Sequence, residues 1–140
     1  MSSKDCIQIY ADGACRGNNC KGTSPGGWGV VMLYKGHIKE LKGYFNSATN
    51  NIMEIIAVKK GLQAIKDKTI PVEVYSDSQY VVSTINEGWV KRANHQYWKE
   101  LYIELSRLPK VTFIKVKGHS DNQYNNRADQ LANEALDEHK

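Results

Sequence analysis

Apolar and polar residues alternate at the beginning of the chain. In the stretch "CIQIYADGA", Ile7, Ile9 and Ala11 occupy every second position between polar neighbours. This period of two is typical of a strand with one buried face. The next stretch, "SPGGWGVVMLYKGHIKELKGYF", consists of two extended runs on either side of Lys35 and Gly36. These runs predict an antiparallel hairpin with a tight turn.

The apolar spacing then changes to that of a helix. The stretch "TNNIMEIIAV" begins a helix with Thr49 or Asn50 as its N-cap, and the pattern continues to about Lys66. Pro71 ends the connection to a short β-branched strand, "VEVYSDS". The following segment, "SQYVVSTINEG", has helical spacing and stops at Gly88, a common C-terminal signal.

Two more helices and one strand complete the pattern. The segment "QYWKELYIELSRL" predicts an amphipathic helix whose apolar side carries Trp98, Leu101, Leu105 and Leu108. The segment "VTFIKVKGH" predicts the last strand. The segment "NNRADQLANEALDE" predicts a final helix with a buried side formed by Ala128, Leu131, Ala132, Ala135 and Leu136.

The element order is therefore β-β-β-α-β-α-α-β-α. A strand, a helix and a second strand in succession normally form a right-handed parallel crossover, while the three leading strands should form an antiparallel meander. We predict an α/β fold with a mixed five-stranded sheet, three strands antiparallel and two further strands parallel, flanked by helices. The length of 140 residues suits one compact domain, which we expect to span residues 1–140.

Composition narrows the class of protein. With 41% hydrophobic and 24% charged residues, the chain resembles ordinary soluble proteins. No apolar run approaches the roughly 18 residues of a membrane span, and "MSSKDC" precedes an alternating strand instead of a signal-peptide apolar region. We therefore expect a cytoplasmic monomer with no membrane partner. Cys6, Cys15 and Cys20 match neither a disulfide framework nor a zinc spacing, and we interpret them as structural or incidental.

Four acidic residues stand near the ends of the predicted elements. Asp12 should end the first strand, just before a break at Gly13, and Asp77 the fourth strand. Glu54 and Asp129 lie in the first turns of the first and last helices. Because ligands of α/β sheets usually bind at the carboxyl ends of strands, such a fold could bring all four acids together.

Three of these acids have an ordinary structural interpretation. Asp12 could form a turn before glycine, Asp77 could cap the next helix, and Asp129 could complement a helix dipole. Glu54 has no such interpretation, because its helical neighbours are apolar and burial of an unpaired carboxylate is costly. A cluster of all four would be mutually repulsive unless cations neutralised it.

Magnesium is the natural cation for such a cluster. It is a hard ion that prefers oxygen ligands and is usually held by a few carboxylates plus water and substrate phosphate. Two such ions about 4 Å apart can activate a water molecule and stabilise the leaving oxygen in phosphodiester cleavage. We therefore interpret Glu54 as a metal ligand whose charge is compensated when the ion is present.

Four motifs resemble, in order and spacing, the signature segments of the type 1 ribonuclease H family. They are "YADGACRGN", "TNNIMEIIAV", "YSDSQYV" and "VKGHSDNQYNNRADQLA", and the resemblance extends from Ile7 to Ala135. It implies a catalytic domain that hydrolyses the RNA strand of RNA–DNA hybrids with two Mg²⁺ ions, for which Mn²⁺ can substitute, leaving 5′-phosphate and 3′-hydroxyl ends. The acidic ligands that it implies are Asp12, Glu54, Asp77 and Asp129.

The same resemblance assigns roles to residues around the acids. His119, in the loop "KGHSDN", matches the family's mobile histidine, which assists proton transfer or product departure. Amide and hydroxyl groups can read the 2′-hydroxyl of RNA, and such residues stand beside the acids. The minor-groove contacts implied are Asn18, Asn50, Asn51 and Gln79, with Ser78 beside them. Thr49 and Asn51 are also expected to grip a phosphate of the DNA strand.

The segment "GWVKRANHQYW" occupies the place where many family members insert a basic helical protrusion. We interpret it as a reduced basic lip in which Lys91 and Arg92 hold the DNA strand and Trp89 lies against deoxyribose. The alternative is a solvated turn whose aromatic residues cap the core. Net charge agrees with a polyanionic partner, since setting aside the four acids raises it from +4 to +8 for the rest of the domain.

Two other classes of protein remain as alternatives. A nucleic-acid-binding module without chemistry would need the basic surface but no cluster of acids. A metal-independent ribonuclease would need two convergent histidines, and of His37, His95, His119 and His139 only His119 lies in a plausible site. Related folds also cut or join DNA, which only activity on all-DNA duplexes would reveal.

Overall fold

The computed structural model describes residues 6–16, 24–87, 95–117 and 122–138. In chain order the elements are β1 (Ile7–Cys15), β2 (Ser24–Tyr34), β3 (His37–Ala48), α1 (Asn50–Gln63), β4 (Val72–Ser76), α2 (Gln79–Glu87), α3 (His95–Ser106), β5 (Val111–Lys115) and α4 (Gln123–Glu138). This order confirms the one predicted from the sequence. No helix in the described ranges is both long enough and apolar enough to cross a membrane.

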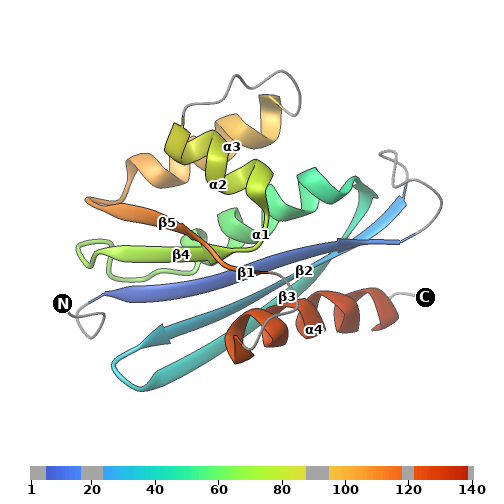
Figure 1. Cartoon of the computed structure of the whole chain (residues 1–140), viewed down its shortest axis with the longest axis horizontal. Helices are drawn as coiled ribbons and strands as arrows, with labels where there is room; N and C mark the ends of the chain where they lie inside the picture. The colour runs from blue at the N-terminus through green and yellow to red at the C-terminus, as the bar shows by residue number, and fades with distance from the viewer. Residues whose placement is uncertain (1–5, 17–23, 88–94, 118–121, 139–140) are drawn as a thin grey trace.

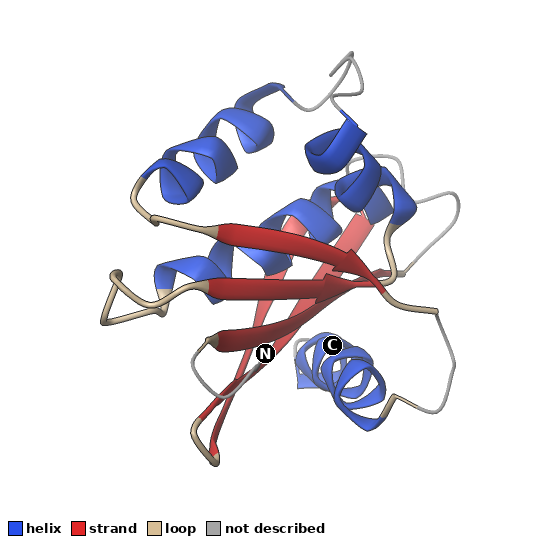
Figure 2. Ribbon diagram, turned by 60° about the vertical axis from the view of Figure 1, so that its left-hand side comes forward, coloured by secondary structure: helices blue, strands red, loops and turns tan. Residues whose placement is uncertain are grey.

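The five strands form one mixed sheet in the order β3-β2-β1-β4-β5. Strand β2 pairs antiparallel with both β1 and β3, while β4 pairs parallel with both β1 and β5. The predicted sheet is therefore confirmed. Figure 1 shows α1, α2 and α3 on one side of this sheet and α4 on the other, and Figure 2 shows the same arrangement from another direction.

The β2–β3 connection is the tight turn that the sequence predicts. Tyr34 and His37 close the hairpin as partners, and Lys35 and Gly36 between them have φ angles of 49° and 84°. Positive φ at both central positions is the geometry of a two-residue turn that matches the twist of the strands, and glycine adopts it without strain.

The helices bury apolar residues against both faces of the sheet. The larger core lies on the side of α1, α2 and α3 and includes Ile9, Val30, Ile55, Val74 and Trp98. The smaller core lies under α4, where Tyr10 and Val31 pack against Ala128 and Leu131. All five residues predicted for the apolar side of the last helix are buried. Residues at odd positions of β1 therefore face the larger core, and Tyr10 faces the smaller core under α4.

Strand β1 continues past the end that the sequence indicates. Asp12, Gly13 and Ala14 pair with Gly29, Trp28 and Gly27, so the predicted break at Gly13 is wrong. The physical reason is the close approach of α1. A Cβ atom at position 13 would lie 2.5 Å from the carbonyl carbon of Met53. Gly13 is therefore required by packing, and Asp12 lies within a strand instead of at its end.

Helix α1 ends at Gln63 with Ala64 as its C-cap, three residues before the predicted end at Lys66. A local turn competes with the helix here. The carboxylate of Asp67 accepts hydrogen bonds from the backbone N–H and the hydroxyl of Thr69, at 3.0 and 2.6 Å. Aspartate commonly stabilises turns in this way, and the turn draws the chain out of the helix.

Candidate active site

Two of the acids lie where the central parallel strands separate. The pairing of β1 with β4 ends at Tyr10 and Tyr75. Asp12 follows two residues later along β1, and Asp77 comes directly after the end of β4. Asp12 is only 4% exposed. The chain also changes direction across the sheet at β1, because β2 lies on one side of it and β4 on the other. Such switch points are the usual ligand sites of α/β sheets.

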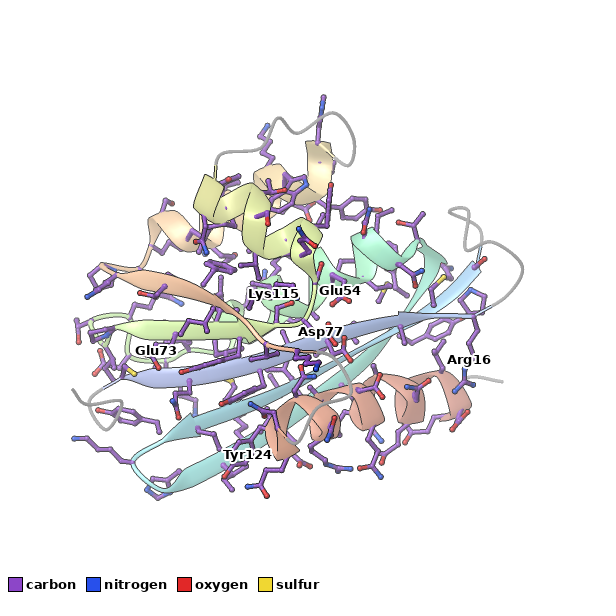
Figure 3. All side chains as sticks on the ribbon, viewed as in Figure 1. Arg16, Glu54, Glu73, Asp77, Lys115 and Tyr124 are labelled. Carbon is purple, nitrogen blue, oxygen red and sulfur yellow. The ribbon has the colours of Figure 1, made fainter. Side chains whose placement is uncertain are left out.

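Helix α1 brings Glu54 to the same place. Thr49 caps the start of the helix, since its hydroxyl oxygen accepts a hydrogen bond from the N–H of Ile52 at 3.1 Å. The N–H of Gly13 donates to Glu54 Oε1 at 3.1 Å and to Asp12 Oδ1 at 3.0 Å. Figure 3 shows Glu54 and Asp77 close together near the middle of the sheet. One carboxylate oxygen from each of Asp12, Glu54 and Asp77 lies within 4.8 Å of the other two.

The fourth acid comes from α4, on the other face of the sheet. Asp129 lines a cavity of about 200 Å³ together with the other three acids, Gly13, Asn125 and Asn126. Asp129 is itself held by Asn133, whose Nδ2 donates to the backbone oxygen of Asp129 at 3.0 Å. Arg16 in turn donates to Oδ1 of Asn133 at 3.3 Å. The structure thus brings together all four acids selected from the sequence.

Burial and mutual repulsion dominate the electrostatics of this cavity. Burial, then the charges of Asp77 and Asp129, raise the pKa of Asp12 to about 8. Burial, followed by the charges of Asp12 and Asp77, raises the pKa of Glu54 well above its usual range. None of the described residues that line the cavity is cationic. Larger cavities lie beside the β2–β3 turn, but they lack such a gathering of acids.

The donor set fits a hard divalent cation. The cavity offers carboxylate oxygens from four residues and amide groups from two more, with no sulfur or imidazole ligand among the described lining residues. Oxygen-only sites of this kind suit Mg²⁺ or Mn²⁺ better than the softer transition metals. A bound cation would also offset the repulsion that, after burial, raises the pKa of Asp12.

The raised pKa of Asp12 predicts how the stability of the metal-free protein depends on pH. The folded state holds a proton on Asp12 up to about pH 8, whereas the unfolded chain releases it near pH 3.8. Between these values the folded state binds more protons, so stability falls as pH rises, by up to about 1.4 kcal/mol per pH unit for each proton. Urea unfolding in EDTA at pH 5, 6, 7 and 8 should show this decline. Added Mg²⁺ should reverse it, and a profile that rises with pH would contradict the assignment.

The amide and hydroxyl residues predicted to bind substrate stand at two helix N-termini. Asn50 and Asn51 are exposed at the start of α1, and Gln79 is exposed at the start of α2. Ser78 caps α2, because its hydroxyl oxygen accepts a hydrogen bond from the N–H of Val81 at 3.2 Å. Capping therefore falls to Ser78, and the alternative in which Asp77 caps this helix is wrong.

Several predicted site residues lie outside the described residues. These are Asn18, Trp89, Lys91, Arg92 and His119, and their roles stay predictions. Conversely, sequence reasoning missed Asn125, which lines the acidic cavity. A usable signal was present, because Asn125 precedes Asp129 by four residues. That spacing places both side chains on one face of a helix.

The sheet is mixed and five-stranded, and carboxylates gather where its central parallel strands separate. These two features define a class of α/β domains with an acidic, oxygen-donor centre. Within that class the chain belongs to the ribonuclease H family, whose model matches residues 4–137. The family resemblance of the four sequence motifs is thereby confirmed.

Individual relatives agree with this assignment. A ribonuclease H from Clostridium botulinum (strain Hall) is 48% identical over 145 residues, which cover 94% of this chain and 96% of that protein. The RNase H1 of the halophilic archaeon Halobacterium salinarum NRC-1 is 30% identical, with a TM-score of 0.80 over 94% of this chain and 98% of that one. LC11-RNase H1, solved in complex with an RNA/DNA hybrid, is 31% identical, with a TM-score of 0.76 over 95% of this chain and 98% of that one.

Proposed function

We propose that this protein is an endonuclease that hydrolyses the RNA strand of RNA–DNA hybrids with two Mg²⁺ ions, leaving 5′-phosphate and 3′-hydroxyl ends. The observation that carries the proposal is the group of carboxylate oxygens from Asp12, Glu54 and Asp77 within 4.8 Å of one another, in a chain of the ribonuclease H family. The hybrid bound to LC11-RNase H1 supports the choice of substrate.

Asp12, Glu54, Asp77 and Asp129 are the residues that would hold the ions, and Mn²⁺ would be accepted by the same oxygens. Bound Mg²⁺ would supply activation of a water molecule and stabilisation of charge on the leaving oxygen. The chain contributes preorganisation. The Gly13 N–H fixes one oxygen each of Asp12 and Glu54, so these carboxylates are oriented before substrate arrives.

Substrate recognition is assigned to the helix N-termini beside the acids. The exposed amides of Asn50, Asn51 and Gln79 offer both donors and acceptors to the minor groove, where RNA displays its 2′-hydroxyls. The Thr49 oxygen accepts from Ile52, which leaves its hydroxyl hydrogen to donate to a phosphate of the DNA strand. Asn18, Ser78, Trp89, Lys91 and Arg92 complete the proposed binding set.

A cleavage assay on three matched duplexes tests the function. RNA–DNA, RNA–RNA and DNA–DNA duplexes of one sequence, labelled at either end of each strand, are incubated with Mg²⁺ or with EDTA. We expect cleavage of the RNA strand of the hybrid alone, its loss in EDTA, and 3′-hydroxyl products that a polymerase can extend. Cleavage that persists in EDTA would favour a histidine mechanism. Binding without cleavage would indicate a non-catalytic module, and cleavage of the DNA duplex would indicate a different nuclease.

His119→Ala tests the proposed assistant. If His119 moves protons or eases product departure, the variant should lower kcat at least tenfold and leave KM nearly unchanged, because the histidine then acts after substrate binding. Steady-state kinetics on the hybrid measure both constants. An unchanged kcat, or a loss confined to KM, would return His119 to a structural role.

Replacing Lys91 and Arg92 with alanine tests the basic lip. Both residues are far in sequence from every acid, so they should contribute binding that is equal in ground and transition states. The double variant should raise KM, keep kcat, and flatten the slope of log K against log salt by roughly 1.4–1.8 for two lost phosphate contacts. The same change at Lys35 and Lys39, beside the β2–β3 turn, is a control matched in charge. A double variant with wild-type KM and wild-type salt slope would show that the lip does not touch substrate.

A further inference from the structure

Asn125 has an acceptor that its surroundings do not satisfy. Its side chain is buried, with only 1% of the residue exposed. Its Oδ1 is the one buried side-chain polar atom without a hydrogen-bond partner in the described parts of the chain. The helix keeps the residue in place, since its backbone N–H donates to Oδ1 of the capping residue Asn122 at 2.9 Å. Buried acceptors are normally paired, so one left unpaired requires an explanation such as a water molecule or an ion.

The location of Asn125 supplies that explanation. Asn125 lines the same cavity as the four acids, one helical turn before Asp129. With cations bound the carboxylates are ionised and can only accept hydrogen bonds, and the Gly13 N–H already donates to Asp12 and Glu54. Among the described residues no group donates to Oδ1 of Asn125, and a water molecule can supply the missing hydrogen. A cavity of about 200 Å³ has room for water, whose share of liquid volume is about 30 Å³ per molecule.

We propose that Oδ1 of Asn125 accepts a hydrogen bond from a water molecule in the acidic cavity, and that Asn125 thereby positions this water for the reaction. A water that donates one hydrogen to Asn125 and the other to a carboxylate has both hydrogens engaged. Its lone pairs then point away from these two acceptors, toward a cation or an electrophilic phosphorus. Mg²⁺ usually keeps several of its waters in proteins, and groups that hold such waters tune the metal's affinity and activity.

The effect of Asn125 on catalysis rests on the proposed function. The water site that Asn125 forms with the acids, called here the hydrated site, does not depend on it. Asn125 acts through the water and is therefore a positioning residue. A purely structural role predicts something different, because a packing residue would change stability without changing the affinity for cations.

Three variants separate these roles. Asn125→Leu keeps the approximate volume and removes the acceptor, while Asn125→Asp keeps an acceptor oxygen. Gln130→Leu removes an exposed amide from the same helix and is the control. Unfolding by urea in EDTA measures the metal-free stability, calorimetric titration with MgCl₂ measures affinity, and hybrid cleavage measures kcat and KM.

We expect Asn125→Leu to retain the metal-free stability, because leucine has a similar volume and leaves no acceptor that must be paired with water. It should weaken Mg²⁺ binding about tenfold, in the range found for groups that orient metal ligands, and lower kcat at least tenfold with KM unchanged. Asn125→Asp should restore Mg²⁺ affinity, and Gln130→Leu should match the wild type. If Asn125→Leu destabilises the metal-free protein and leaves Mg²⁺ affinity and kcat at wild-type values, the proposal is wrong.

A measurement on the unaltered protein covers the case in which Asn125→Leu does not fold. The side-chain amide resonances of Asn125 in ¹⁵N-labelled protein should shift as Mg²⁺ is added and saturate with the calorimetric affinity. Resonances that do not move would overturn the proposal. If the wild type fails to cleave hybrids while Mg²⁺ affinity still depends on Asn125, the proposed function fails and the hydrated site stands.

Discussion

Asp12→Asn is expected to lower hybrid cleavage by several orders of magnitude while the protein remains folded. The amide keeps the shape of the side chain but removes the charge that would hold cations between Asp12, Glu54 and Asp77. Without metal, the variant should be at least as stable as the wild type, because repulsion among the buried carboxylates is relieved. It should also lose the part of the decline in stability with pH that Asp12 contributes, while buried Glu54 keeps its own part. Cleavage rates in Mg²⁺ and urea unfolding in EDTA measure the two effects.

Asp67→Asn is a matched control for this experiment. Asp67 is exposed in the turn after α1, and asparagine supports the same kind of turn. Its activity and metal affinity should equal those of the wild type. If Asp12→Asn retains a tenth of wild-type activity in Mg²⁺, Asp12 is not an essential ligand.

Gly13→Ala is expected to damage both the fold and the site. The added Cβ would lie 2.5 Å from the carbonyl carbon of Met53 and 2.7 Å from its Cβ, so α1 must move away from β1. Overpacking of this kind typically costs about 1–3 kcal/mol, and more where backbone must shift. The same movement separates Glu54 from the N–H that orients it. We therefore expect a lower free energy of unfolding, weaker Mg²⁺ binding and at least a tenfold lower kcat for the folded fraction.

Gly36→Ala provides the comparison for Gly13→Ala. The same methyl group at position 36 meets nothing within 4 Å, but the φ of +84° is unfavourable for alanine. It should cost about 1–2 kcal/mol through backbone strain alone and leave kcat unchanged. Wild-type stability and kcat in Gly13→Ala would show that α1 and β1 are not as closely packed as described.

Features that depend on local pattern could be predicted from the sequence. The alternation in β1 and the helical spacing in α4 define buried faces. Lys35-Gly36 marks a turn of the geometry that two-residue hairpins require. Glu54 could be singled out because a carboxylate among apolar helix neighbours conflicts with burial unless it has a partner. In each case one segment carries enough information to decide its own structure.

Features that depend on contact between distant segments could not be predicted in this way. Gly13 reads as a strand break in isolation, and only the proximity of Met53 explains it. The predicted end of α1 was wrong because a turn at Asp67 competes with helical spacing. Asn125 reads as one polar residue among several near the start of a helix. Its importance follows from burial and from an unpaired oxygen, neither of which is visible in a sequence.

The close docking of α4 has a consequence for how the protein responds to cations. Positions 27 and 29 of β2 admit no Cβ, since one at position 29 would lie 2.2 Å from the backbone oxygen of Ala128. Ion pairs of Arg127 with Glu40 and of Lys42 with Glu134 and Glu138 hold the outer side of the helix to β3.

Because α4 supplies Asp129 from one face of the sheet and α1 supplies Glu54 from the other, the acidic cavity is complete only while both helices are seated. A cation that binds all four acids favours the seated state over any state in which α4 has detached. Amide hydrogen exchange in α4 should therefore slow when Mg²⁺ binds, more than exchange in the β2–β3 turn, which carries none of the four acids. By the same linkage, salt that screens the ion pairs between α4 and β3 would weaken Mg²⁺ binding, although none of the four acids takes part in those pairs.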